Sequence, residues 1–244
     1  KVYAAPGNPG MAIAADLHPR RAVIADGHHR YATFLRYQAD RHAAGDGSGP
    51  WDLGLAFLVD GSAFGPEVHA IHRAVPGLDP RRAAELAATG FTVVEVAGGI
   101  DVATEALAKA GTRGTAFVLT DGEAAWLLTD PDNERLAAAV PADRSAAWRA
   151  LDVAVAHTLL IRELWQLEDS EQVVEFHHDV PAAVAAAWAS GGTALRLNPT
   201  PVADVAAVAA AGDRMPRKST LFVPKPATGL LIRSMTCGTS ITTI

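Results

Sequence analysis

The sequence predicts an α/β (α+β) protein that contains a mixed sheet. Segments with helical periodicity alternate with short apolar segments typical of buried strands, and glycine, proline or aspartate stands between most of them. The first such group, residues 22–59, consists of an apolar segment, a tight loop, an amphipathic segment and a second apolar segment. This order predicts a βαβ unit with a right-handed crossover.

The elements of this βαβ unit follow from its side chains. Val23 to Ala25 are small or β-branched apolar residues, and they predict a strand that leads into the loop Asp26 to Arg30. Leu53 to Val59 is a continuous apolar run, as in a strand that is buried on both faces. A helix is predicted between them, because five residues recur at helical spacing: Tyr31, Phe34, Leu35, Gln38 and His42.

Start and stop signals predict the remaining elements, beginning with a short helix at 12–17. The sequence Asp121-Gly122 predicts a hairpin, and His157 is interpreted as a packing residue on a long helix. The further helices are predicted at Asp79–Gly90, Asp101–Ala110, Arg144–Leu167, Pro181–Ala189 and Pro201–Ala211, and the strands at Phe91–Val96, Thr115–Thr120, Ala125–Thr129, Val173–Phe176, Ala194–Leu197 and Phe222–Lys225. We expect three regions, 1–75 with the loop, 76–140 as a small α/β region, and 141–244 as a helix-rich α/β region.

Composition limits the class of protein. The 244 residues are 49% hydrophobic and 20% charged, enough to bury a core in one large domain or two small ones. The formal net charge of −6 argues against nucleic-acid binding. The single cysteine, Cys237, excludes an internal disulfide and suits a reducing cytosol. No apolar run approaches the roughly 20 residues that span a bilayer, so we expect a cytoplasmic protein with no membrane partner, and the oligomeric state stays open.

The loop Asp26-Gly27-His28-His29-Arg30 combines chemistry with a suitable geometry. Gly27 permits a positive φ, the amides of the following first helical turn can bind an anion, and Arg30 can add a bidentate fork. Phosphate is the natural occupant, with Gly27 and Arg30 as binding residues. Asp26, His28 and His29 are the candidate catalytic residues.

A structural interpretation of the same loop also exists. Asp26 and Arg30 could pair with each other while one histidine donates to a backbone carbonyl, so that the residues only brace a strand-to-helix corner. However, two adjacent histidines beside an acid and a base are unfavourable to desolvate, and such groups gather where function needs them. We therefore favour the functional interpretation.

A second basic segment, residues 217–225, follows Asp213. Its three cations are Arg217, Lys218 and Lys225, and they lie within nine residues in a protein that is acidic overall. The plain interpretation is a solvated loop that enters a strand. The functional interpretation is a second phosphate contact made by Lys218, Ser219, Thr220 and Lys225. We expect this segment to fold back so that Lys218 or Lys225 lies beside Arg30.

Two further histidine groups do not predict a metal site. They are the pair His69 and His72 and the sequence His177-His178-Asp179. Adjacent histidines on a strand point to opposite faces, and the sequence has no H-E-x-x-H motif or cysteine pair to anchor a zinc ion. Asp179 also suits the N-cap of the helix that begins near Pro181.

Two blocks of the chain resemble one family. The run IADGHHRYATFL, Ile24 to Leu35, resembles the hallmark of DUF1015, a bacterial and archaeal family without an established activity, and Gly212 to Leu231 resembles its closing hallmark. The segments between them that look familiar in the same order are His69–Arg73, Leu151–Val153 and Asn198–Val202. The resemblance covers nearly the whole chain. It implies that this chain corresponds to the C-terminal part of a longer protein.

A more distant resemblance suggests a reaction. The core Gly27-x-His29-Arg30 is similar to the phosphate-binding loop of the ParB/sulfiredoxin superfamily, which includes free-serine kinases, and DUF1015 members often lie beside serine-biosynthesis genes. This resemblance implies ATP or ADP with Mg²⁺ as cofactor and a small hydroxyl metabolite such as serine as phosphoryl acceptor. Arg30 would hold phosphate, His28 or His29 would donate to it, and Asp26 would bind Mg²⁺ or orient a histidine. The alternative is a non-catalytic sensor of a small phosphorylated metabolite.

Overall fold

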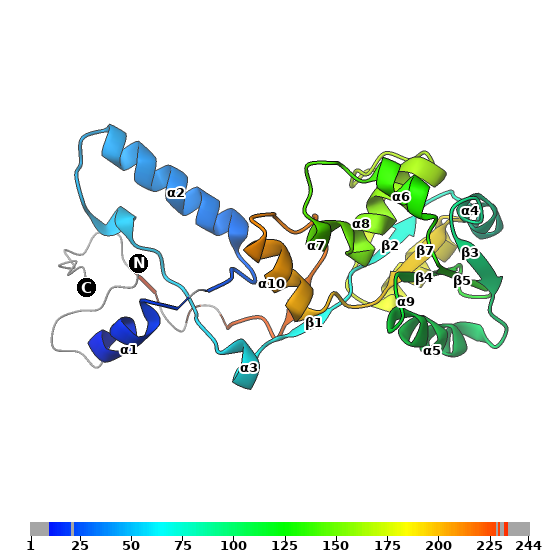
Figure 1. Ribbon diagram of the computed structural model, residues 1–244, viewed down its shortest axis with the longest axis horizontal. Helices are drawn as coiled ribbons and strands as arrows, with labels where there is room; N and C mark the ends of the chain where they lie inside the picture. Colours follow the sequence, from blue (N-terminus) through cyan, green and yellow to red (C-terminus); the bar gives the residue numbers. More distant parts are fainter. Residues whose placement is uncertain (1–9, 21, 228, 230–231, 234–244) are drawn as a thin grey trace. The chain divides into compact units, whose positions relative to one another are not determined.

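The computed structural model describes residues 10–20, 22–227, 229 and 232–233 (Figure 1). The chain divides into two units: unit 1 comprises residues 1–66 and 224–244, and unit 2 comprises Glu67–Val223. The two outer parts of the sequence thus share one unit, whereas the sequence analysis divided the chain into three successive regions. Cys237 and parts of the closing block, residues 228, 230 and 231, lie outside the described residues.

Unit 2 is built on a six-stranded sheet with the strand order β3-β5-β4-β7-β2-β6. Every described pairing in it is antiparallel, which confirms the α+β class. The sequence analysis expected a mixed sheet, and these pairings include no parallel one. Its strands are β2 (His72–Val75), β3 (Thr92–Glu95), β4 (Ala116–Thr120), β5 (Ala125–Thr129), β6 (Glu175–His177) and β7 (Thr193–Leu197). The predicted hairpin at Asp121-Gly122 is confirmed as the β4–β5 pair.

Helices cover both faces of this sheet. Phe117 and Leu119 project to the face that packs against α4 (Pro80–Ala87), α7 (Ala146–Arg149), α8 (Asp152–Val155) and the π-helix η2 (Ala156–Leu164). Ala116 and Val118 project to the opposite face, against α5 (Gly99–Gly111). Figure 1 shows α5 and α8 on opposite sides of the sheet. Strand alternation therefore sorts large side chains to one face and small ones to the other.

Three further elements complete unit 2. α9 (Val180–Ala189) packs small side chains on the same face as α5. α6 (Asn133–Ala139) and α10 (Val202–Ala210) contribute to the opposite, larger core through Leu136 and Val208. β1 (Glu67–His69) and β8 (Leu221–Val223) form a separate antiparallel pair, which holds the first and last residues of unit 2 together.

The predicted long helix Arg144–Leu167 is interrupted. Leu151 has extended backbone angles between α7 and α8, and its side chain is buried in the core. The chain then changes from α-helical to π-helical hydrogen bonding at Ala156. Burial of Leu151 thus takes precedence over the continuous helical periodicity of the sequence.

Unit 1 contains helices but no described strand. These helices are α1 (Gly10–Leu17), α2 (His28–Ala43), the 3₁₀-helix η1 (Pro50–Asp52) and α3 (Gly61–Phe64). The prediction of α2 is confirmed, whereas the strands predicted at Val23–Ala25 and Leu53–Val59 are wrong, and so is the βαβ unit that they would form. Apolar composition marks segments that can be buried, but a strand also needs a partner, and neither segment pairs with another in the described structure. Phe57 is 75% exposed.

No helix among the described residues is both long enough and apolar enough to cross a bilayer.

The predicted helix starts at Asp79 and Asp179 are confirmed. Each side chain accepts a hydrogen bond from the backbone amide three residues later, at Arg82 and Ala182, and both distances are 2.8 Å.

Asp79→Ala should lower the free energy of unfolding by about 1 kcal/mol, because it leaves a first-turn amide of α4 without its acceptor. Urea unfolding followed by circular dichroism measures this change. Glu85→Ala on the same helix removes only an exposed ion pair with Arg82 and should change the value by less than about 0.5 kcal/mol. Equal effects of the two variants would contradict the capping role.

Candidate functional site

The predicted phosphate loop lies at the start of α2 in unit 1. Gly27 precedes the helix with φ of 86° and ψ of 19°, a left-handed conformation that glycine adopts without strain. Among the described residues, no side chain caps this end of the helix. The first-turn amides of α2 are therefore the groups that the predicted anion site would use.

The side chains around Gly27 gather on the same turn. A Cβ atom placed on Gly27 would come within 3.0 Å of the Arg30 guanidinium, which therefore folds back over the glycine. The rings of His28 and His29 lie 4.1 Å apart, centre to centre, and both residues are exposed. Cationic and imidazole groups thus surround the helix start without being buried.

Asp26 is held by the closing block of the chain. Lys225 Nζ donates to Asp26 Oδ2 over 2.8 Å, and Gly27 N donates to Asp26 Oδ1 over 2.6 Å. The Lys225 ammonium, the Gly27 amide and the charge of Arg30 together lower the pKa of Asp26, against the opposing effect of partial burial. The Asp26–Arg30 pair that the structural interpretation required is not among the described ion pairs. Asp26 pairs with Lys225 instead.

The other predicted binding residues lie in unit 2. Lys218 has a left-handed φ of 52°, and its ammonium lies 3.9 Å from Glu171. Ser219 is buried, and its carbonyl accepts a hydrogen bond from Thr200 over 3.3 Å. Thr220 follows it at the entry to β8. The predicted segment is therefore divided at residue 224, with Lys225 in unit 1 and Lys218 to Thr220 in unit 2.

Unit 2 contains a buried polar cluster that the sequence analysis missed. At its centre, Arg73 on β2 is 1% exposed. Its guanidinium donates to His157 Nε2 over 2.8 Å, to the Lys218 carbonyl over 2.9 Å and to the Ile71 carbonyl. The ring of Phe176 lies 5.3 Å from the same guanidinium. One buried cation thus connects β2, η2 and the closing block.

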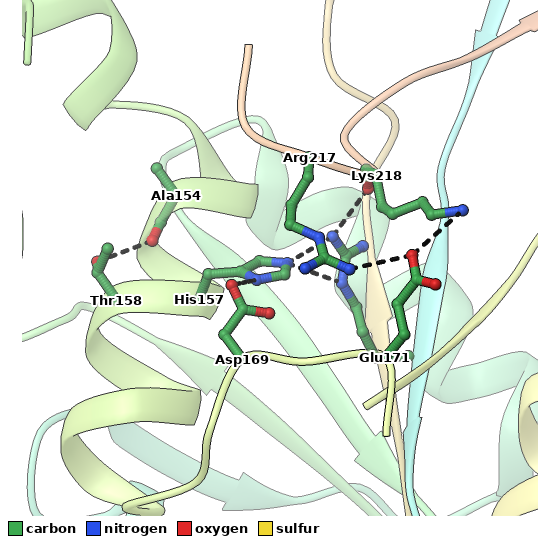
Figure 2. Close-up of polar contacts among 8 residues, drawn as sticks. Ala154, His157, Thr158, Asp169, Glu171, Arg217 and Lys218 are labelled. Atoms are coloured by element: carbon green, nitrogen blue, oxygen red, sulfur yellow. Dashed lines mark hydrogen bonds and ion pairs between the residues drawn. The ribbon is translucent and has the colours of Figure 1, made fainter. Parts of the chain in front are cut away.

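The protonation of His157 follows from these contacts. Arginine has no acceptor, so His157 Nε2 must accept from Arg73, and Nδ1 must carry the ring proton. Nδ1 lies 2.8 Å from Asp169 Oδ2 (Figure 2). Burial lowers the pKa of His157, the positive charge of Arg73 acts in the same direction, and Asp169 opposes both. His157 is therefore a neutral link between a carboxylate and a buried guanidinium.

Asp169 retains its charge in this cluster. Burial acts to raise its pKa, but the hydrogen bond with His157 and the charges of Arg217 and Arg73 outweigh burial and lower it. The other carboxylate oxygen, Oδ1, is buried and has no hydrogen-bond partner in the described structure. The cluster therefore presents one unused acceptor.

The opposite face of the sheet has its own cavity, of about 380 Å³. His72 and Arg196, both buried, line it together with His69, His178 and Asp179. The structure thus brings the two histidine groups of the sequence analysis to one cavity. Among the described residues, no group of three or more histidine, cysteine or carboxylate side chains has metal-binding geometry.

The missed residues gave a weak signal in the sequence. Strand β2 begins with a histidine and an arginine, residue types that are rare in a buried strand. His157 was interpreted as a packing residue, and it is indeed buried, but it also has two charged partners. A buried arginine needs acceptors, and neither a strand nor a helix pattern locates them.

Arg73→Met should lower the free energy of unfolding by about 3–5 kcal/mol, because it leaves three buried acceptors, the Ile71 and Lys218 carbonyls and His157 Nε2, without their donor. Urea unfolding measures the loss. Arg82→Met, on the surface, is the matched control and should cost less than about 1 kcal/mol. A loss for Arg73→Met no larger than this control would refute the role of the buried guanidinium.

His72 should make stability depend on pH. Burial and the charge of Arg196 lower its pKa from 6.5 to about 4 in the folded protein. Above pH 6.5 the residue is neutral in both states, and between pH 6.5 and 4 only the unfolded state binds the proton, so stability falls as the pH falls. The loss should reach about 3 kcal/mol.

The His72→Gln variant isolates this contribution from that of Asp152. Burial raises the pKa of Asp152 to about 6, which acts in the opposite direction over an overlapping range. The difference in unfolding free energy between wild type and His72→Gln should therefore change between pH 7 and pH 4. A pH-independent difference would be inconsistent with a neutral, buried His72.

The comparisons with known proteins are consistent with the family resemblance. The family model DUF1015, described as a protein of unknown function, matches residues 9–154, a range that contains the loop Asp26–Arg30 and strand β2. The closing block at Gly212–Leu231 follows the matched range. No curated protein and no solved structure matches the chain. Because the match covers more than half of the 244 residues, the chain belongs to the DUF1015 family.

Proposed function

We propose that the protein binds the phosphate group of a small molecule at the start of α2. The observation that carries this proposal is the ion pair between Lys225 and Asp26 at 2.8 Å. It brings a second cation to the loop that already contains Arg30, from a segment almost 200 residues away. A phosphate at the loop would then meet a guanidinium, an ammonium and backbone amides.

The physical properties of these groups suit a phosphate ligand. Arg30 offers a planar fork that matches two phosphate oxygens, and Lys225 acts as a point charge. The uncapped first turn of α2 adds amide donors and the positive end of the helix dipole. Asp26 keeps Lys225 beside the loop in the absence of ligand. Lys218, Ser219 and Thr220 stay a prediction as further contacts.

The finer proposal is phosphoryl transfer from ATP or ADP with Mg²⁺ to a small hydroxyl metabolite such as serine. Phosphoryl transfer depends mainly on positioned positive charge and on a metal held between carboxylate and phosphate oxygens. Asp26 is the carboxylate beside the loop that fits this metal role. His28 and His29 are exposed on the same turn and are the candidate residues to donate to the phosphate or to accept the proton of the attacking hydroxyl.

One observation favours the alternative, a non-catalytic sensor. Both carboxylate oxygens of Asp26 already accept hydrogen bonds, and its pKa is lowered, so Asp26 is a weak general base. The loop would then recognise a phosphorylated metabolite without reacting with it. Binding and turnover have to be measured separately.

Binding is tested by thermal unfolding of the full chain with inorganic phosphate, ADP or ATP, each with and without Mg²⁺. A ligand selective for the folded state should raise the melting temperature. Arg30→Ala and Lys225→Ala should each reduce this increase, whereas Arg36→Ala, an exposed arginine on the same helix, should not. Lys218→Ala shows whether that residue contributes. If no phosphate compound changes the melting temperature, or if Arg36→Ala acts like Arg30→Ala, the loop is not the binding site.

Turnover is tested by following ATP or ADP consumption with serine and other small hydroxyl compounds. Activity that is lost in His29→Ala would support the kinase. Binding that depends on Arg30 without any nucleotide consumption would support the sensor.

A further inference from the structure

We propose that a cavity in unit 2 binds a small phosphorylated molecule that also carries a hydroxyl or amino group. The cavity has a volume of about 350 Å³ and lies between α7, η2 and the segment 214–217. His157 and Asp169 of the buried cluster line it. Four arginines also line it, namely Arg144, Arg162, Arg214 and Arg217. All of its residues belong to unit 2, whereas the loop at α2 belongs to unit 1.

The charges around the cavity are unbalanced. Arg144 pairs with Asp213 at 3.4 Å, and Arg217 pairs with Glu171 at 3.0 Å. Within the part of the chain that the structure describes, no carboxylate lies within 4 Å of Arg162 or Arg214. Like charges gathered around one cavity repel each other, and an anion relieves that repulsion. Two guanidinium groups are therefore available to a phosphate.

Three buried polar atoms on lining residues have no hydrogen bond of good geometry within the described structure. His157 Nδ1 still lies 2.8 Å from Asp169 Oδ2, which leaves Arg144 Nε as a donor and Asp169 Oδ1 as an acceptor. Buried polar atoms are nearly always hydrogen-bonded in folded proteins, so a ligand that supplies the missing partners would be favoured beside this wall. The donor suits a phosphate oxygen. The acceptor suits a hydroxyl or amino group on the rest of the ligand.

The polar wall of the cavity is held rigidly. Thr158 donates to the Ala154 carbonyl over 2.8 Å, and Asp169 reaches His157 from the neighbouring loop, as Figure 2 shows. The π-helical bonding of η2 places residues four and five positions apart on one side, which aligns His157 and Thr158 with Arg162. Arg73 fixes the ring of His157 from behind. The part of the wall formed by His157 and Thr158 therefore needs little reorganisation to bind a ligand.

The size of the cavity selects a small ligand. Ligand pockets cover roughly 300–1,000 Å³, and this one lies near the lower limit. A phosphorylated compound of three or four carbons suits this space better than a nucleoside triphosphate. Glycerol 3-phosphate is a suitable probe, since it combines a phosphate with two hydroxyl groups.

Trp148 provides the measurement, because it lines the cavity and is buried there. Titration of the full chain with glycerol 3-phosphate should change the tryptophan fluorescence, and Trp148→Phe should remove that change. Arg162→Gln and Arg214→Gln replace exposed residues, so they should leave the fold intact and weaken binding about tenfold each. Arg113→Gln, an exposed arginine outside the cavity, is the matched control.

Further titrations distinguish binding in this cavity from binding at the loop, and phosphate recognition from general anion binding. Arg30→Ala should leave the Trp148 signal and its affinity unchanged. Succinate should bind much more weakly than glycerol 3-phosphate, and so should glycerol, which lacks the phosphate. The proposal is overturned if glycerol 3-phosphate gives no Trp148 signal, or if Arg162→Gln and Arg214→Gln bind it as tightly as Arg113→Gln. It is also overturned if Arg30→Ala abolishes the signal, or if succinate binds as tightly as glycerol 3-phosphate.

Discussion

Burial of the Arg73 guanidinium is the constraint on which the polar organisation of unit 2 depends. A buried cation is tolerated only when acceptors surround it and a negative charge lies near. Here the acceptors come from three distant parts of the chain, namely Ile71, His157 and Lys218, and the charge comes from Asp169 through the ring of His157. The strand, the π-helix and the closing segment must therefore meet at one point. The left-handed backbone at Lys218 is part of this arrangement, since its carbonyl is one of the acceptors.

The dipeptide His72-Arg73 gives the two faces of the sheet different chemistry. Successive strand residues project to opposite faces, so Arg73 reaches η2 on one side while His72 lies beside Arg196 on the other. Each face then has a buried arginine near a cavity, and the two cavities have similar volumes of about 350 and 380 Å³. Arg196 lines its cavity directly, whereas Arg73 contacts His157, which lines the other one. A buried neutral histidine accompanies each arginine, and in each case burial and the nearby guanidinium lower the histidine pKa.

The sequence predicted those features that are determined by neighbouring residues. The caps at Asp79 and Asp179 and the Asp121-Gly122 hairpin depend on contacts only a few residues apart, and all three were correct. Strand pairing depends on residues far apart, which explains why Leu53–Val59 was assigned wrongly and why β2, with its polar start, was missed. Similarly, the helix start at Gly27 follows from local pattern, whereas the partners of His157 come from β2 and from the loop that contains Asp169.

The two candidate sites differ in how far the protein prepares them for a ligand. Around the loop, Asp26 and Lys225 are about half exposed, and α2 has no buried residue, so ligand binding must also order these side chains. Around the unit 2 cavity, His157 and Thr158 are already fixed by buried hydrogen bonds. Exposure would suit the proposed phosphate loop, since a site that turned over a substrate would have to exchange its ligands. Rigidity would suit a cavity that selects one small anion by shape, and this difference in buried contacts is the reason why we propose different roles for the two sites.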